Sequence, residues 1–167
     1  RVISDGSLHH IQMEWADGTP VGDTMLTTDD DGTVVYCRGY DIADVLLGDV
    51  AVNWSWTGGT VGALSPANGT STSLTLTSPG TDKIAVEFSP IMVDTSGTIT
   101  VAAGVPAELV ISPDEASVSV DSSLDFSTVS LDADGNLSNP QVVPTWAVLG
   151  GIGDIDAAGH FSPSTVG

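Results

Sequence analysis

The chain has 167 residues, enough for one large domain or two small ones, and 41% of them are hydrophobic, so it has the material to bury a core. It carries 22 Asp and Glu against 3 Lys and Arg. The formal net charge of −19 is repelled by phosphate backbones and excludes nucleic acid as a partner. No apolar run reaches the roughly 18–20 residues of a membrane-spanning helix, so we expect no membrane span in this segment.

Short β-branched runs separated by Gly, Pro, Asn and Asp recur along the chain and predict an all-β fold. The first set of expected strands is 10–15, 33–40, 50–57, 73–77, 83–88 and 98–102. The second set is 107–112, 117–120, 124–131, 142–149 and 159–162. Apolar and polar residues alternate in 73–77, which places Leu74 and Leu76 on one face. The stretch 103–107 lies between the sets, so we predict two domains, 1–103 and 104–167.

An acidic turn, a strand with tryptophan, a double glycine and an apolar residue occur twice, about 92 residues apart. The paired positions are Asp41 and Asp132, Trp54 and Trp146, Gly58-Gly59 and Gly150-Gly151, and Leu64 and Ile155. Because one copy has the size of a domain, the repeat predicts two modules rather than a solenoid.

The second copy contains an Asp-x-x-Gly-Asn turn at 132–136, a strand around Trp146 and a Gly-x-Ile-Asp-x-x-Gly-x-Phe hairpin at 153–161. These motifs resemble those of the bacterial immunoglobulin-like repeats found in adhesins and large surface proteins. The first copy, through 39–41 and 48–54, resembles a related prokaryotic surface repeat. The resemblance implies tandem immunoglobulin-like β-sandwiches in an exported protein, located outside the cell or on its surface.

The resemblance also implies two terminal strands after Phe161, for which positions 162–167 are too short. We therefore expect the second sandwich to lack its terminal strands as given. Either the chain is a piece of a longer tandem protein, or another chain supplies a strand by β-augmentation. The N-terminal segment is the candidate strand donor, with the apolar set Val2, Ile3, Leu8 and Ile11. The alternative is that this segment is the first strand of its own module.

A calcium site is the one cofactor that the sequence suggests. Asp132, Asp134 and Asn136 place oxygen side chains at positions one, three and five of a short loop, a spacing that suits a hard cation. Leu137 and Val143 stand at positions six and twelve, which excludes an EF-hand. The alternative is a turn between two strands in which Gly135 has a positive φ angle.

We expect no enzymatic activity. The three histidines show no zinc-ligand spacing, there is no Gly-x-Ser-x-Gly motif, and 5% aromatic residues leave little material for a sugar-cleaving cleft. Cys37 is the single cysteine and lies in an apolar run, so we expect a buried and inert thiol.

Trp54 and Trp146 are expected in the cores, while Trp15 or Trp56 could instead mark a ligand contact. The first functional hypothesis is a structural or adhesive module of a cell-surface protein or self-assembling filament, whose partners are copies of itself or neighbouring modules. The alternative is an accessory carbohydrate-binding module of a secreted enzyme, with a cell-surface or polysaccharide ligand. Exposed tryptophans on a concave sheet face would favour the alternative.

Overall fold

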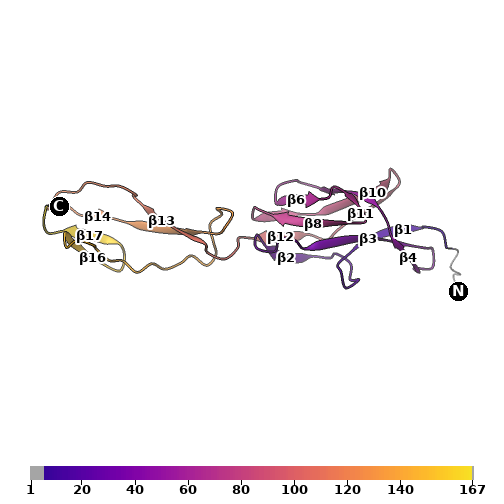
Figure 1. Ribbon diagram of the computed structural model, residues 1–167, viewed down its shortest axis with the longest axis horizontal. Helices are drawn as coiled ribbons and strands as arrows, with labels where there is room; N and C mark the ends of the chain where they lie inside the picture. Colours follow the sequence, from indigo (N-terminus) through magenta and orange to yellow (C-terminus); the bar gives the residue numbers. More distant parts are fainter. Residues whose placement is uncertain (1–5, 167) are drawn as a thin grey trace. The chain divides into compact units, whose positions relative to one another are not determined.

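The computed structural model describes residues 6–166 and divides the chain into two compact units. Unit 1 is Arg1–Gly104 and unit 2 is Val105–Gly167, one residue away from the boundary predicted above. Every regular element among the described residues is a β-strand, so the all-β prediction is confirmed (Figure 1). The described residues therefore contain no helix that is long and apolar enough to cross a membrane.

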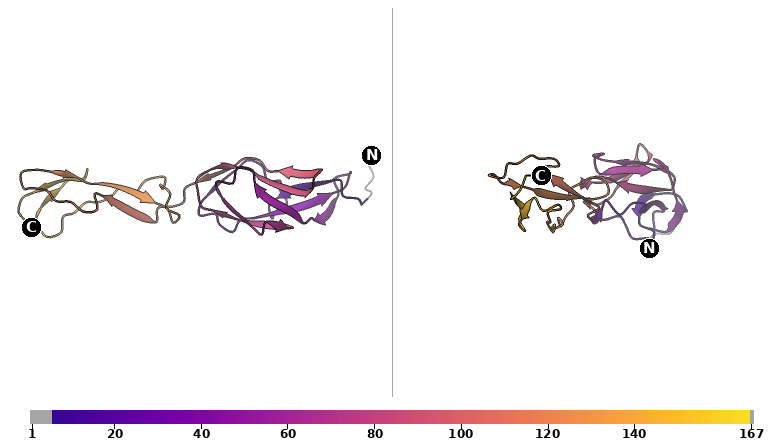
Figure 2. Two further views of the ribbon diagram at one scale, coloured as in Figure 1. Left: turned by 90° about the horizontal axis from the view of Figure 1, so that it is seen from above. Right: turned by 60° about the vertical axis from the view of Figure 1, so that its left-hand side comes forward.

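Unit 1 contains three sheets, whose strands Figure 2 shows from two further directions. The first has the order β1-β3-β8-β6, with β4 also pairing with β3, the second β11-β10-β5-β7, and the third β2-β12-β9. The strands of the first sheet are β1 (His10–Glu14), β3 (Val34–Tyr40), β4 (Leu46–Asp49), β6 (Gly62–Ser65) and β8 (Ser71–Leu76). Those of the second are β5 (Val52–Trp56), β7 (Asn68–Gly69), β10 (Ile84–Ser89) and β11 (Met92–Thr95). Those of the third are β2 (Thr24–Thr27), β9 (Gly80–Asp82) and β12 (Ile99–Ala102).

The core of unit 1 is built from alternate residues of its strands. In β3 buried and half-buried positions alternate, so that Val35 and Cys37 face inward together with Leu74 and Leu76 of β8. The cluster also includes residues of the other two sheets, such as Val86 of β10. Apolar faces of all three sheets thus meet in one core, from which water is excluded.

Unit 2 has two small sheets. One pairs β13 (Glu108–Ser112) with β15 (Ser127–Leu131), and the other has the order β14-β17-β16. Its members are β14 (Leu124–Asp125), β16 (Gly153–Ile155) and β17 (His160–Pro163). All five residues of β13 are exposed, and Phe161 is the one hydrophobic residue of the described part of unit 2 that is buried.

Two expected strands of unit 2 are wrong. Residues 117–120 and 142–149 form no strand, and the expected strand 124–131 is divided at Phe126 into β14 and β15. A strand needs a neighbour with which to form ladder hydrogen bonds, whatever its apolar content. Within residues 6–166 these two segments have no such neighbour.

Candidate functional site

A cavity of about 880 Å³ lies in unit 2. This volume lies within the range of ligand-binding pockets. Its lining includes the apolar side chains of Ile111, Val118, Phe126, Trp146, Ile155 and Phe161. They are contributed by β13, the loop after it, the single residue between β14 and β15, the loop before β16, and strands β16 and β17. We call this feature the apolar groove.

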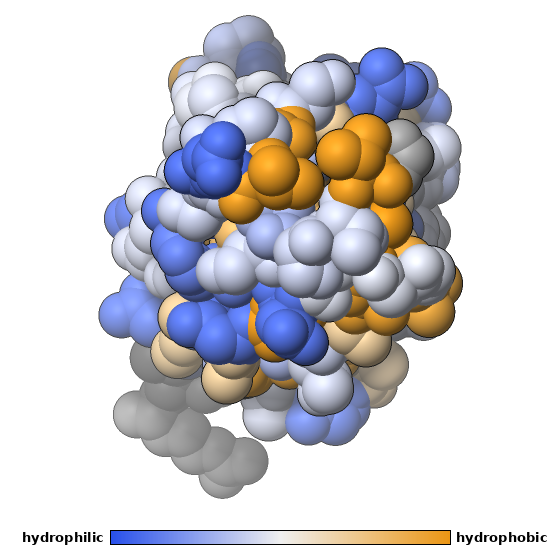
Figure 3. Space-filling model, turned by 90° about the vertical axis from the view of Figure 1, so that its left-hand side faces the viewer, coloured by the Kyte–Doolittle hydropathy of each residue, from blue (hydrophilic) through white to orange (hydrophobic). Residues whose placement is uncertain are grey.

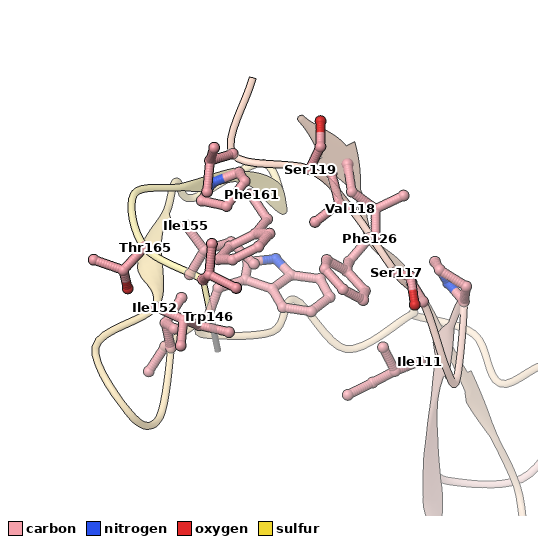
Figure 4. A pocket seen from close by; sticks show the side chains of 18 of the residues that line it. Ile111, Ser117, Val118, Ser119, Phe126, Trp146, Ile152, Ile155, Phe161 and Thr165 are labelled. Atoms are coloured by element: carbon pink, nitrogen blue, oxygen red, sulfur yellow. The ribbon is translucent and has the colours of Figure 1, made fainter. Parts of the chain in front are cut away.

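Three aromatic rings form the centre of the apolar groove. The ring centroids of Phe126 and Trp146 are 6.2 Å apart, and those of Phe126 and Phe161 are 6.4 Å apart at an interplanar angle of 66°. These are favourable tilted and edge-to-face arrangements. Figure 4 shows the three side chains directed toward one another inside the cavity. Trp146 is half-buried and its ring lines the cavity, so it is less deeply placed than the core position predicted for it.

Gly159 allows the Trp146 ring to lie against the backbone. A Cβ at this position would collide with the carbonyl oxygen of Phe126 and would lie 3.2 Å from the Trp146 ring. The φ angle of Gly159 is +88°, a conformation that other residues adopt rarely. The glycine in the 153–161 hairpin motif is therefore required both by the turn and by the packing of the tryptophan.

Two segments beside the apolar groove, each outside the regular strands and each containing a bend, make no backbone hydrogen bonds. Across residues 143–151 and 113–118, no backbone N–H or C=O group is hydrogen-bonded to any other described residue. Trp146, Ala147 and Val148 of the first segment line the cavity, as does the whole of the second except Glu115. The groove is thus bordered by backbone that is available for pairing with a further strand.

The surroundings of the apolar groove are negatively charged. Unit 2 contains nine of the 22 acidic residues of the chain and no Lys or Arg. Asp114 lines the cavity itself, and Asp125 adjoins the lining residues Leu124 and Phe126. The Nδ1 atom of His160 lies 2.6 Å from Oδ1 of Asp125. Within the described part of unit 2, this histidine is the sole side chain able to become positively charged.

In Figure 3, which looks onto the C-terminal unit, apolar residues gather beside hydrophilic ones. Several large apolar side chains of unit 2 are almost fully exposed, among them Leu149 at 91% and Val143 at 89%. An exposed apolar surface beside a cavity with an apolar lining is typical of an interaction site.

The residues proposed as calcium ligands form a turn that is capped by an aspartate side chain, which was the alternative to a calcium site. Oδ1 of Asp132 accepts hydrogen bonds from the backbone N–H groups of Asp134 and Asn136, at 3.0 and 2.8 Å. Asp132 is buried, and the side-chain amide of Asn136 donates to its carboxylate as well. Gly135 has φ +81°, as a turn of this kind requires.

The same turn occurs at two other hairpins. Asp41 accepts from the N–H groups of Ala43 and Val45, and Asp156 accepts from those of Ala158 and His160. The hydrogen bonds from His160 and Ala158 lower the pKa of Asp156. The repeated acidic motif therefore encodes one local structure, in which an aspartate satisfies two backbone donors.

Among the described residues, no three His, Cys, Asp or Glu side chains lie close enough together to hold a metal ion. Calcium binding stays a prediction. Its test is a comparison of melting curves in CaCl2 and in NaCl of equal ionic strength, because only a specific site makes the two differ.

Of the four residues proposed for the donor segment, Leu8 and Ile11 lie among the described residues. Ile11 lies in β1 opposite Gly39 of β3 and is 5% exposed, and Leu8 packs against the same core. Both therefore belong to their own module, as in the alternative considered above, with Ile11 in its first strand and Leu8 just before that strand. Val2 and Ile3 lie outside the described residues.

The tryptophans of unit 1 are packing residues. Trp54 is 4% exposed, and its indole N–H donates to the carbonyl oxygen of Gly69 at 3.0 Å, so its predicted place in the core is confirmed. Trp15 and Trp56 are half-buried and pack against the same core. None of the three forms an exposed platform on which a sugar ring could stack.

Sequence reasoning missed a buried charge network in unit 1. The Glu14 carboxylate is 2% exposed, its Oε2 lies 2.7 Å from Nη1 of Arg38, and its Oε1 accepts from the Tyr40 hydroxyl. Burial, with the hydrogen bond to Glu14, raises the pKa of Tyr40 to about 12. The available signal was a single arginine within a strand of an otherwise acidic chain.

Cys37 is buried and free, as expected. Burial, and then the nearby charges of Asp94, Asp49 and Glu14, raise the pKa of its thiol to about 12. The thiol is therefore protonated at neutral pH and is unreactive as a nucleophile.

The sequence matches none of the protein-family models, and none of the curated proteins, with which it was compared.

Proposed function

We infer that this chain is a structural module of an exported cell-surface protein or extracellular filament. In this proposal unit 1 is an immunoglobulin-like sandwich that carries tension, and unit 2 connects to a neighbouring chain by accepting a strand from it. Both parts act by mechanical connection and not by catalysis.

The observation that carries the proposal is the parallel pairing of β2 with β12. The register runs from Thr24 opposite Ile99 to Thr27 opposite Ala102. Hydrogen bonds continue the ladder at both ends, from Thr24 N–H to the Thr98 carbonyl and from Thr28 N–H to the Ala102 carbonyl, each at 3.0 Å. The first and the last part of unit 1 are thereby joined directly.

Parallel pairing of β2 with β12, the last strand of unit 1, determines how this ladder responds to tension. A pull on the chain before β2 and after β12 acts in opposite directions along two adjacent strands. The ladder hydrogen bonds are then loaded together in shear, whereas an antiparallel hairpin pulled at its open end would lose them one by one. Unit 1 therefore has the strand arrangement of a module that resists extension.

The placement of the first strands supports an immunoglobulin-like arrangement. β1 pairs antiparallel with β3 in one sheet, and the chain then crosses to pair as β2 with β12 in another. One edge segment thus serves two sheets that share a core. This arrangement covers sheet edges and ties the sheets together, as an isolated module under load requires.

Single-molecule pulling on the whole chain tests the proposal. We expect one discrete unfolding event of unit 1, releasing roughly 350 Å of chain from its 104 residues at about 3.4 Å each. The variant Thr24→Pro removes the N–H that donates to Thr98 and should lower the unfolding force. Met25→Ala is the matched control, because this side chain is 80% exposed and the ladder stays intact.

The proposal is wrong if unit 1 extends without a discrete event, or if Thr24→Pro and Met25→Ala unfold at equal forces. Circular dichroism of each variant shows whether the sandwich remains folded before it is pulled.

A further inference from the structure

We propose that Asn68 of unit 1 is the attachment site of an N-linked glycan, transferred to its side chain from a lipid-diphosphate-linked oligosaccharide. The inference rests on the proposed export of the chain, because this modification belongs to secreted and surface proteins. It goes beyond the proposed function by assigning a covalent modification, its acceptor atom and the chemical class of its donor.

The sequence contains several acceptor triplets for such a glycan. Three of its four asparagines begin the pattern Asn-x-Ser/Thr with a residue other than Pro in the middle, namely Asn53, Asn68 and Asn136. Fewer than a quarter of the residues are Ser or Thr, so random placement gives fewer triplets than the chain contains. The pattern is the same at all three positions, whereas their structural surroundings differ.

The triplet in unit 2 is closed to a transferase. The side-chain amide of Asn136 donates to both carboxylate oxygens of Asp132, at 3.2 and 3.1 Å. The third residue of the triplet, Ser138, is 3% exposed, and its Oγ donates to the carbonyl oxygen of Ser130 at 3.0 Å. Because the acceptor pattern consists of the amide and this hydroxyl, transfer to Asn136 would require the capped turn to open and a buried serine to become exposed.

The triplet at Asn53 is fixed in its sheet by its middle residue. Asn53 is exposed on β5, where it lies opposite Glu87 of β10 and Asn68 of β7. Trp54, the next residue, is 4% exposed and belongs to the core of unit 1. The triplet can leave the sheet and enter an enzyme only if this tryptophan leaves the core, which returns a large apolar area to water.

The triplet at Asn68 is exposed and lies at a sheet edge. β7 has two residues and is the last strand in the order of its sheet. Asn68 and Thr70 are both exposed, and the Asn68 side chain has no hydrogen bond to another described residue. The carbonyl oxygens of Gly69 and Thr70 accept from Trp54 and Cys37, but no side chain of the triplet is part of the core. A short edge segment of this kind opens locally at low cost, so its amide and its hydroxyl can be presented together.

The transfer is a substitution at the first carbon of the oligosaccharide. Nδ2 of Asn68 forms a bond to this carbon, and the bond between the carbon and the diphosphate oxygen breaks. The lipid diphosphate leaves with the electron pair of the broken bond, and one Nδ2 proton passes through a base of the transferase to solvent. No oxidant or reductant takes part. The attached glycan stands at the edge of the second sheet, where its bulk blocks pairing of β7 with a strand of another molecule.

Transfer to the whole folded chain tests the site. The enzyme is a single-subunit oligosaccharyltransferase with its lipid-linked donor, chosen because it modifies each of the three triplets as a synthetic peptide. Mass spectrometry of the intact chain counts the glycans, and peptide mapping locates them. We expect one glycan per chain, on Asn68. Relative to the rate for the matching peptide, transfer to Asn68 should be at least tenfold faster than transfer to Asn53 or Asn136.

Three variants provide the controls. Asn68→Gln removes the acceptor and Thr70→Ala removes the hydroxyl, and each should abolish the glycan although two other triplets remain. Asn53→Gln is the matched control, because it removes the exposed asparagine directly opposite and should leave the glycan in place. Circular dichroism of each variant establishes that unit 1 is folded.

Two results in this experiment overturn the proposal: an unmodified Asn68 in the folded chain, or equal relative rates for the three triplets. A third is the absence of a glycan on Asn68 in the natural chain, isolated from the cells that make it. If the folded chain accepts the glycan in vitro and the natural chain lacks it, the export on which the inference rests is contradicted, and the acceptor geometry is not. The pulling experiment is independent of all three results, because it reports on the β2–β12 ladder of a chain without glycan.

Discussion

The two units contain the same local elements, but they differ in how far their hydrophobic cores are closed to solvent. Fourteen buried apolar residues form the core of unit 1, whereas Phe161 is the one fully buried apolar residue of the described part of unit 2. Both units contain the aspartate-capped turn and a tryptophan at the same repeat position. The difference lies in pairing: Trp54 is on β5, between β10 and β7, and Trp146 is on a segment with no neighbouring strand.

This contrast shows that an apolar pattern is not sufficient to close a core. Residues 142–149 are as apolar as those of a true strand, yet Val148 and Trp146 line a cavity instead of packing under a second sheet. Burial of apolar area requires a second layer, and the second layer is a set of strands that must find partners of their own.

The largest expected difference between the units comes from truncating one leucine in each. Leu74→Ala, at a residue with 0% exposure in unit 1, should cost about 3 kcal/mol of unfolding free energy, because it removes transfer energy and leaves a cavity. Leu109→Ala in β13, where the side chain is 43% exposed, should cost less than about 1 kcal/mol. Urea denaturation, monitored through the NMR signals of each unit, measures both losses of unfolding free energy. Similar losses in the two variants would contradict the contrast.

The next largest effect is expected in the buried charge network of unit 1. Arg38→Ala leaves the Glu14 carboxylate buried beside Tyr40 without its cation, which should cost about 2–3 kcal/mol, a value reduced because Arg38 itself is partly exposed. Adding Glu14→Gln removes the buried charge and should restore part of the loss. If the unfolding free energy of Arg38→Ala lies within about 0.5 kcal/mol of that of the wild type, the network does not hold β1 against β3.

The capped turns should respond alike in both units. Asp41→Ala and Asp132→Ala each leave two backbone N–H groups without their acceptor, and each should destabilise its hairpin by about 1–2 kcal/mol. The Asn variants keep an oxygen acceptor and serve as controls. If Asp132→Ala were silent while Asp41→Ala destabilised unit 1, the turn in unit 2 would be a minor contributor.

The smallest expected effect is a loss of stability of unit 1 at acidic pH. Burial alone would raise the pKa of Asp82, but hydrogen bonds from the Thr57 hydroxyl and from the N–H groups of Lys83, Gly58 and Gly59 lower it below its ordinary value of 3.8. The unfolded chain then takes up the proton first. The stabilisation is complete above pH 3.8 and is lost as the pH falls through the folded-state pKa.

Asp82→Asn should accordingly reduce the stability of unit 1 by about 1 kcal/mol at pH 6, and this difference should shrink as the pH falls through the folded-state pKa of Asp82. Denaturation of the wild type and the variant across this range gives the comparison. A difference that is constant with pH would mean that the charge of Asp82 plays no part.

Much of unit 1 was predictable from its sequence because its strands alternate. The strands β3, β8 and β10 fall within or close to their predicted ranges, and Leu74 and Leu76 share the core face. The strands β2, β4, β6 and β11 were missed, since they are short and mostly half-buried or exposed, and only pairing defines them. Local periodicity contains no information on such partners.

The site was less predictable than the fold. The hairpin motif contains Ile155 and Phe161, but nothing local to the sequence indicated that these residues and Trp146 would line a cavity. The burial of Glu14 depends on the chain returning to place Pro20 opposite it, a contact that no pattern within β1 contains. The capped turns, in contrast, are fully local, and the sequence predicted them as the alternative to calcium.

Backbone hydrogen exchange of the chain alone tests the central claim most directly, because it measures the closure of each unit residue by residue. The account predicts strong protection for amides of β3, β8 and β10, and exchange close to that of an unstructured peptide for 143–149 and 114–118. Comparable protection in the two units would contradict it: unit 2 would then be closed in solution, with no groove open to a further strand.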